Sequence, residues 1–168
     1  YQIGELAKRC KRAIGSVVCW GSSIIGELGD GLGTASDVPV RVRLLREVGQ
    51  VTGAFAHGCA RYGTGDVACW GDNSEGQLGN GLAPTDSLVP VPVSALAKAV
   101  EAMTGYNTSC ARRANGQVSC WGDNSSGQLG NGLPLASSAT PVSAAGSWSA
   151  IAGDSGQSTA LLGPDGIV

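Results

Sequence analysis

Residues 110–132 read CARRANGQVSCWGDNSSGQLGNG, and this phrase decides the fold because versions of it occur three times in the chain. Each version joins Cys-Trp-Gly to a later Gly-x-Leu-Gly-x-Gly-Leu run. The tryptophans are Trp20, Trp70 and Trp121, which lie 50 and 51 residues apart. A period of this length is typical of architectures that stack one supersecondary unit repeatedly.

The pieces of each repeat have the character of short β-strands joined by tight turns. Segments 67–70 and 118–121 are rich in β-forming residues and are bounded by glycine and asparagine. Asn115-Gly116 predicts a hairpin turn. Segments 41–44 and 89–93 alternate in polarity or size, and Pro90 and Pro92 predict an edge strand because proline cannot donate to a ladder. About four short strands in ~50 residues predict propeller blades.

We therefore expect an all-β chain of β-propeller blades, each a four-stranded antiparallel sheet, with three blades and the start of a fourth. The approximate units are 3–52, 53–103, 104–152 and an incomplete 153–168. Blades bury their faces only against neighbouring blades, and propellers close with about 4–8 of them. The expectation is a partial ring, either a segment of a longer propeller or a protomer completed by neighbouring chains.

The composition excludes several other classes of protein. The 168 residues include 27 Gly and 7 Pro, and only 14% are charged, which argues against a helical bundle or coiled coil. A net charge of −2 gives no basic surface of the kind that binds nucleic acid. No continuously apolar stretch reaches the ~18 residues of a membrane helix. We expect neither a nucleic-acid partner nor a membrane span.

The six cysteines form three local pairs, whose members lie nine or ten residues apart around an expected hairpin turn. Residues directly opposite in a hairpin have Cα atoms ~4.5–5.5 Å apart, which suits a disulfide. Disulfides would indicate an oxidising compartment. Two alternatives stay open: reduced cysteines buried as small hydrophobes, and a zinc site, although there is no Cys-x-x-Cys and only one histidine. The expected pairs are Cys10 with Cys19, Cys59 with Cys69, and Cys110 with Cys120.

The run from Cys110 to Gly132 resembles the regulator of chromosome condensation repeat. The resemblance is close from Gly53 to Pro141 and weaker in the first unit, where Ser23-Ile24-Ile25 replaces the Asn-Ser-Ser type of turn. It implies a propeller that usually has seven blades, of which this chain would hold three to four. The paired cysteines resemble those of secreted bacterial members of the family.

The repeated apolar residues are expected to form a core at equivalent positions of successive blades. The Asp-Asn-Ser loops that begin at Asp72 and Asp123 are expected to form Asx-turns, because they lack the ligand spacing of an EF-hand. His57, the sole histidine, is expected to make a strand-end hydrogen bond. No catalytic, cofactor-binding or metal-binding set is expected, since the glycine runs lack the context of a phosphate loop. The expected core residues are Trp20, Trp70, Trp121, Leu28, Leu78 and Leu129, joined by Val17, Val67 and Val118.

These observations favour a non-enzymatic interaction or scaffold module that binds a protein or glycan, or that forms part of a cell-surface assembly with other copies of itself. The expected location is extracellular, at the cell surface or in the periplasm. An alternative is a secreted enzyme inhibitor, as in the β-lactamase-inhibiting propeller that the family resembles, and it would need aromatic residues on one face. A third function, nucleotide exchange on a small GTPase as in the nuclear namesake, is disfavoured by the paired cysteines and the lack of a basic tail.

Overall fold

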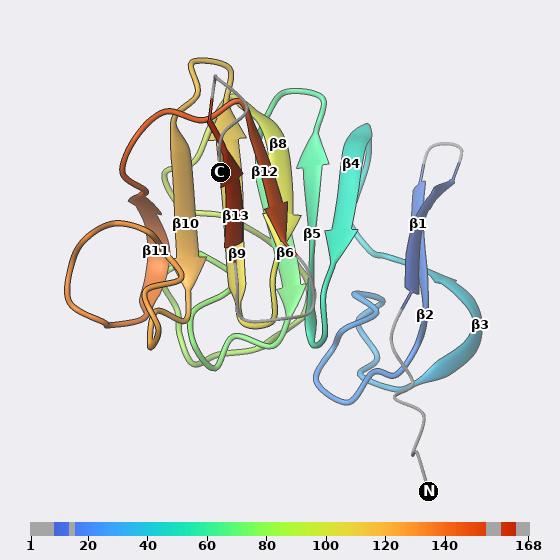
Figure 1. The fold of residues 1–168 in the computed structure, drawn as a ribbon. Helices are drawn as coiled ribbons and strands as arrows, with labels where there is room; N and C mark the ends of the chain where they lie inside the picture. The colour runs from blue at the N-terminus through green and yellow to red at the C-terminus, as the bar shows by residue number, and fades with distance from the viewer. Residues whose placement is uncertain (1–8, 14–15, 154–158, 164–168) are drawn as a thin grey trace, which may run out of the picture.

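A computed structural model describes residues 9–13, 16–153 and 159–163, and these residues form β-strands connected by turns and loops (Figure 1). None of the described residues forms a helix long and apolar enough to cross a membrane. The strands make antiparallel sheets whose order follows the sequence. The chain is therefore all-β, as expected from the repeat.

Three sheets correspond to successive blades, and a two-stranded hairpin follows them. Blade 1 contains β1 (Arg9–Ala13), β2 (Ser16–Gly21) and β3 (Ser36–Arg41). Blade 2 contains β4 (Val48–Gly53), β5 (His57–Tyr62), β6 (Val67–Gly71) and β7 (Ser87–Pro92). Blade 3 contains β8 (Ala99–Thr104), β9 (Thr108–Arg113), β10 (Val118–Gly122) and β11 (Ser138–Ser143). The hairpin is β12 (Ala150–Gly153) with β13 (Thr159–Leu162).

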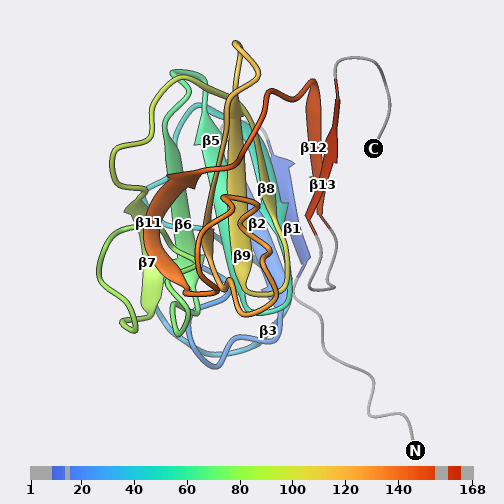
Figure 2. The same ribbon diagram turned by 60° about the vertical axis from the view of Figure 1, so that its left-hand side comes forward.

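The blades stack in chain order, as parts of a propeller do. β1 packs beside β4, β4 beside β8, and β8 beside β12. Figure 2 shows β12 and β13 standing next to the blade that contains β8. The apolar core lies between neighbouring sheets in three clusters, and the cluster between blades 1 and 2 joins Leu28 and Val42 to Trp70. The structure is thus a partial propeller.

The sheets and the sequence repeat are out of phase by one strand. The hydrogen-bonded sheet of blade 2 runs from residue 48 to 92 and that of blade 3 from 99 to 143. The unit boundaries expected at 53 and 104 therefore fall at the ends of the strands β4 and β8, which open each sheet. The parts of the expected first and fourth units at 3–8, 14–15, 154–158 and 164–168 lie outside the described residues.

One strand expectation is confirmed and one is wrong. β7, which holds Pro90 and Pro92, is the edge strand of blade 2. The strand expected over 41–44 instead ends at Arg41, because the chain turns beyond it and Leu44 adopts a left-handed φ of 62°. Val42 still points inward and is buried.

The strands end on two opposite faces of the blades. We call the face with the connections 42–47 and 93–98 and the hairpin turns 63–66 and 114–117 the turn face. Gly63 N donates to the carbonyl of Glu47, which joins two of these segments. The loop face carries the long loops after each Trp-Gly and the short turns 54–56 and 105–107, which Asp72 N links through its bond to the Ala56 carbonyl.

Candidate functional site

The cysteine pairs lie across the central hairpin of each blade. Each pair faces its partner directly in the strand register, with Cα atoms 4.1 Å apart. All six sulfurs are in disulfides: Cys10–Cys19, Cys59–Cys69 and Cys110–Cys120. Disulfides form and persist in oxidising compartments, so these three bonds indicate that environment. They also leave no thiolate for the zinc or free-cysteine alternatives.

The repeated leucines and valines lie in the core between blades. Leu28, Leu78 and Leu129 are each 0% exposed. Val17, Val67 and Val118 are also buried. These positions recur in the same phase of the repeat, and each of the three core clusters contains one of the leucines and one of the valines.

The repeated tryptophans are not equivalent, which differs from the sequence expectation. Trp70 and Trp121 are 0% exposed, whereas Trp20 is only half-buried. Trp70 packs on Leu28 of the preceding blade, and Trp121 packs on Leu78. No earlier blade covers Trp20 within the described residues, and the Lys11 ammonium lies 5.9 Å over its ring. Burial of this residue depends on a preceding blade.

The polar residues of the long loops hold the scaffold together. In blade 2, Asp72 accepts from Ser74 N and from Gln77 Nε2, which gives the expected Asx-turn. Asn73 is fully buried and accepts from Leu78 N. In blade 1, the Glu27 carboxylate helps to fix the corresponding loop, because it accepts from backbone N–H groups of that loop. These groups are therefore engaged in structure.

His57 also lies within the scaffold. It is fully buried, and its Nε2 lies 2.8 Å from Ser109 Oγ on the neighbouring blade. Ser109 Oγ in turn donates to the carbonyl of Gln77, at 2.9 Å. The histidine is a buried contact between blades 2 and 3 rather than an exposed reactive group.

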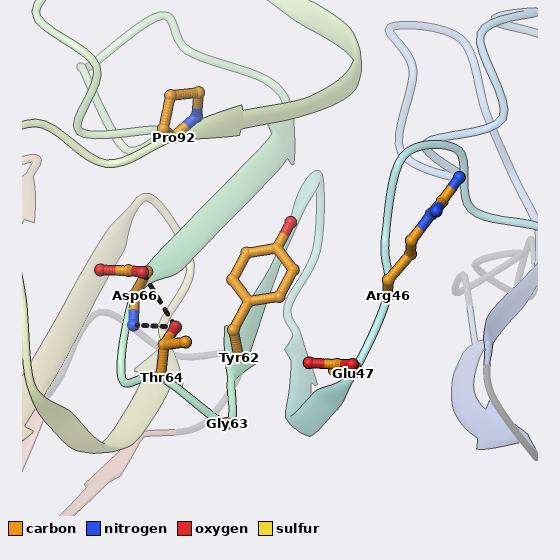
Figure 3. Close-up of a pocket in the computed structure, with 7 residues that line it drawn as sticks. All are labelled: Arg46, Glu47, Tyr62, Gly63, Thr64, Asp66 and Pro92. Atoms are coloured by element: carbon orange, nitrogen blue, oxygen red, sulfur yellow. Dashed lines mark hydrogen bonds between the residues drawn. The ribbon is translucent and has the colours of Figure 1, made fainter.

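A pocket of about 420 Å³ opens on the turn face at the junction of blades 1 and 2. We call it the junction pocket. Arg46 and Glu47 come from the connection between β3 and β4, and the hairpin turn between β5 and β6 supplies most of the rest (Figure 3). Its lining residues are Arg46, Glu47, Tyr62, Gly63, Thr64, Asp66 and Pro92.

Tyr62 stands at the centre of the pocket with carboxylates on either side of it in Figure 3. Burial and, to a smaller degree, the negative charge of Asp66 raise the pKa of the Tyr62 phenol. The phenol therefore stays protonated at neutral pH and presents a hydrogen-bond donor. Asp66 is held by Thr64, whose hydroxyl donates to Oδ2 at 2.8 Å. The pocket thus combines an aromatic ring, one guanidinium group and two carboxylates on exposed turns.

At the equivalent place between blades 2 and 3, the corresponding side chains are hydrogen-bonded to each other and to neighbouring groups. Arg113 stands where blade 2 has Tyr62, and it donates to the Ala97 carbonyl, to Gln117 Oε1 and to Ser119 Oγ. Gln117 Nε2 also donates to Ser143 Oγ. The backbone is similar at both junctions, and the side chains that line the junction pocket differ from those at the next junction.

Sequence reasoning missed this site, because it followed what the repeats share. Four of the lining residues lie within the second version of the repeated phrase, at positions where the repeats differ: Tyr62, Gly63, Thr64 and Asp66. The sequence did contain a signal, because the repeats carry different residues at aligned positions. Tyr62 aligns with Arg113, and Glu47 aligns with Lys98. The positive φ values of Glu47 (51°) and Lys98 (59°) agree, so backbone strain there belongs to the repeat and marks no site.

The stacked blades, the out-of-phase sheets and the interblade tryptophans define a segment of a β-propeller built from sequence repeats. Residues 64–112 match a model of the regulator of chromosome condensation (RCC1) repeat, and residues 98–128 match a second model of the same repeat. Residues 64–128 of this chain therefore match the regulator of chromosome condensation repeat. Comparison with curated proteins found no significant match.

Solved structures of this fold superpose well on the chain at low sequence identity. Human WBSCR16 is 24% identical with a TM-score of 0.71, over 82% of this chain and 35% of that one. Prp20p from Saccharomyces cerevisiae, described with its binding to Gsp1p and histones, is 19% identical with a TM-score of 0.70, over 78% and 34%. Yeast RCC1 (Prp20) bound to Kap60 is 19% identical with a TM-score of 0.70, over 83% of this chain and 36% of that one. The chain spans about a third of these structures, and the similarity establishes the shared fold.

Proposed function

We propose that this chain is a non-enzymatic interaction module of an extracellular, cell-surface or periplasmic compartment, and that it binds a protein or glycan partner through the junction pocket. The observation that carries the proposal is the difference between two equivalent junctions. In blade 3, Arg113 and Gln117 are hydrogen-bonded to each other and to neighbouring groups, whereas the corresponding Tyr62 and Asp66 of blade 2 line a pocket. Binding specificity in repeat folds resides in such variable loop residues.

The chemistry of the pocket fits recognition. A rigid aromatic ring, a guanidinium group and carboxylates on fixed turns are the kinds of groups that anchor protein and glycan ligands. The turns are fixed by backbone hydrogen bonds, such as Gly63 N to the Glu47 carbonyl at 3.1 Å, so binding requires little ordering. The three disulfides support the assignment to an oxidising compartment, and the resemblance to secreted members of the family supports its placement outside the cell.

The test uses a variant that copies blade 3 into blade 2. Tyr62→Arg combined with Asp66→Gln should fill the junction pocket without altering the repeat core. The native chain and this variant would be screened against a displayed peptide library and a glycan array. Ligands that bind the native chain should no longer bind the filled variant. They should still bind Arg113→Ala, which is the matched control. Identical binding profiles for the native and filled chains would refute the role of the pocket.

A second candidate, a secreted enzyme inhibitor, is favoured by one observation on the loop face. Phe55 and Tyr106 occupy the same turn in blades 2 and 3, and their rings stack with centroids 5.0 Å apart. Phe55 is 50% exposed, which provides the aromatic surface that such an inhibitor needs. Under this candidate, Phe55→Ala would abolish inhibition of the target enzyme and the filled-pocket variant would retain it.

A further inference from the structure

Three arginines occupy the same position in successive blades. Arg12, Arg61 and Arg112 each lie on the strand before the disulfide hairpin turn, and each faces the valine that follows that turn in the strand register. Because the repeat places them alike, their surroundings can be compared directly. The comparison shows that one guanidinium group is neutralised by the protein and two are not.

Arg112 has a carboxylate partner. Its Nε lies 3.0 Å from Glu101 Oε2, on the adjacent strand β8. The same oxygen accepts from the backbone N–H of Ile151 at 3.3 Å, which ties blade 3 to β12. This is the one ion pair within the described part of the chain.

Arg61 lacks that carboxylate because Gln50 stands in the place of Glu101. Gln50 pairs with Arg61 in the strand register, as Glu101 pairs with Arg112. Both ends of its amide bond to blade 3, since Nε2 donates to the Ala102 carbonyl and Oε1 accepts from Ala102 N. The Nε of Arg61 is consequently buried without a hydrogen-bond partner.

A second guanidinium group reaches the same place from blade 1. Arg12 Nη1 donates to the carbonyl oxygens of Val48, at 3.2 Å, and Gly49, at 3.0 Å. The Arg61 guanidinium lies against Gly49 as well, since a Cβ at this glycine would be 2.8 Å from Nη2. Both guanidinium groups thus lie beside Gly49, and no carboxylate of the described residues pairs with either. Like charges held close together repel unless a counterion compensates them.

We propose that Arg12 and Arg61 form an oxyanion-binding site beside Gly49, where an external carboxylate, sulfate or phosphate group supplies the negative charge that Glu101 supplies beside Arg112. Planar guanidinium donors match the oxygens of such groups and hold them through charge-assisted hydrogen bonds. The ligand is either an acidic side chain of a partner protein or a free or glycan-borne sulfate or phosphate. This site adjoins the junction pocket, because Arg61 Nη1 donates to the carbonyl of Tyr62 at 3.1 Å, but it does not depend on the pocket's role.

The test exchanges the carboxylate between the two blades. Arginine Nε–H signals would be followed by NMR during titration with sodium sulfate, phosphate or glutarate, at an ionic strength held constant with chloride. In the native chain, the Arg61 signal should shift and saturate, and the Arg112 signal should not. Gln50→Glu supplies an internal carboxylate and should weaken binding at Arg61 by about tenfold or more. Glu101→Gln should create a new response at Arg112.

The outcomes separate the sources of the anion. Tighter binding of glutarate supports an acidic side chain, and tighter binding of sulfate or phosphate supports a free or glycan-borne group. Arg12→Lys keeps the charge but loses the planar fork, so it should also weaken binding. An Arg61 signal that responds no more than the arginines elsewhere, or a response that Gln50→Glu leaves unchanged, would overturn the proposal. The filled-pocket variant retains Arg12 and Arg61. If that variant still bound the ligands of the native chain, the junction-pocket proposal would fail, but the anion titration of Arg61 would remain a valid test of this site.

Discussion

The indole N–H of Trp121 donates a hydrogen bond of 2.9 Å to the backbone carbonyl of Gln77, which belongs to the loop of the preceding blade. Trp70 makes the same bond to the carbonyl of Glu27. Both tryptophans are fully buried by these loops, whereas Trp20 is half-buried. The repeated tryptophan is therefore an interblade contact, and its contribution to stability depends on the blade before it.

Replacing the tryptophans should have unequal effects. Trp121→Phe removes the bond to Gln77 and leaves unfilled volume, so we expect a loss of about 1–3 kcal/mol in the free energy of unfolding. Trp20→Phe lies on a partly exposed site and should change stability by less than about 1 kcal/mol. Chemical denaturation measures both. Equal losses would show that the tryptophans are equivalent and that the interblade account is wrong.

The loop glycines offer a second view of the same contact. A Cβ at Gly79 would lie 2.7 Å from Trp121 Nε1, whereas the nearest atom to a Cβ at Gly130 is 3.8 Å away. Both glycines have positive φ, 68° and 59°, so alanine strains the backbone at both by a similar amount, roughly 1 kcal/mol. Gly79→Ala should therefore lower the melting temperature clearly more than Gly130→Ala. Matching melting temperatures would mean that the tryptophan does not occupy this position in solution.

The disulfides should be complete and stabilising. Mass tagging of thiols in protein from an oxidising host should label none of the six cysteines, even after denaturation without reductant. Cys59→Ala with Cys69→Ala opens a loop whose ends are 10 residues apart, which should lower the unfolding free energy by about 2–4 kcal/mol. Six tagged thiols in the untreated protein would restore the reduced, intracellular interpretation.

Much of this fold is predictable from the sequence because its determinants repeat in phase. The cysteine pairs, the buried leucines such as Leu78 and the edge strand with Pro90 all follow from local spacing and from the chemistry of single residues. The burial of Trp20 was not predictable in this way, because it depends on a neighbouring blade rather than on the local phrase. The same reasoning assigned 41–44 to a strand, since alternation alone does not reveal the left-handed turn at Leu44.

The candidate sites were not predictable from the shared phrase because they arise from its exceptions. Tyr62 lines the junction pocket at the position where the next repeat has Arg113, which is hydrogen-bonded to the Ala97 carbonyl. Gln50 leaves Arg61 without the carboxylate that Glu101 gives Arg112. Each exception is visible when the repeats are aligned, but its meaning depends on which side chains the folded blades bring together.

The ionisation of Tyr62 should make the chain sensitive to alkaline pH. Its pKa is raised in the folded protein, first by burial and then by Asp66, so the unfolded chain releases this proton first. The stabilisation from Tyr62 is present below the unfolded pKa of about 10 and is lost as pH rises from there toward the folded pKa. Unfolding free energies measured between pH 8 and pH 11 should show this decline, and Tyr62→Phe should reduce it. A decline that is the same in both proteins would assign it to other groups.

The central claim is that partners bind the turn face at the junction of blades 1 and 2. Hydrogen exchange of the chain, alone and with a ligand selected from the peptide or glycan screen, tests it most directly. We predict that the ligand slows exchange in the segments 44–49 and 62–66 and leaves the equivalent segments 95–100 and 113–117 unchanged. Slowed exchange confined to the loop-face turns at 54–56 and 105–107 would contradict the claim and support the inhibitor surface around Phe55 instead.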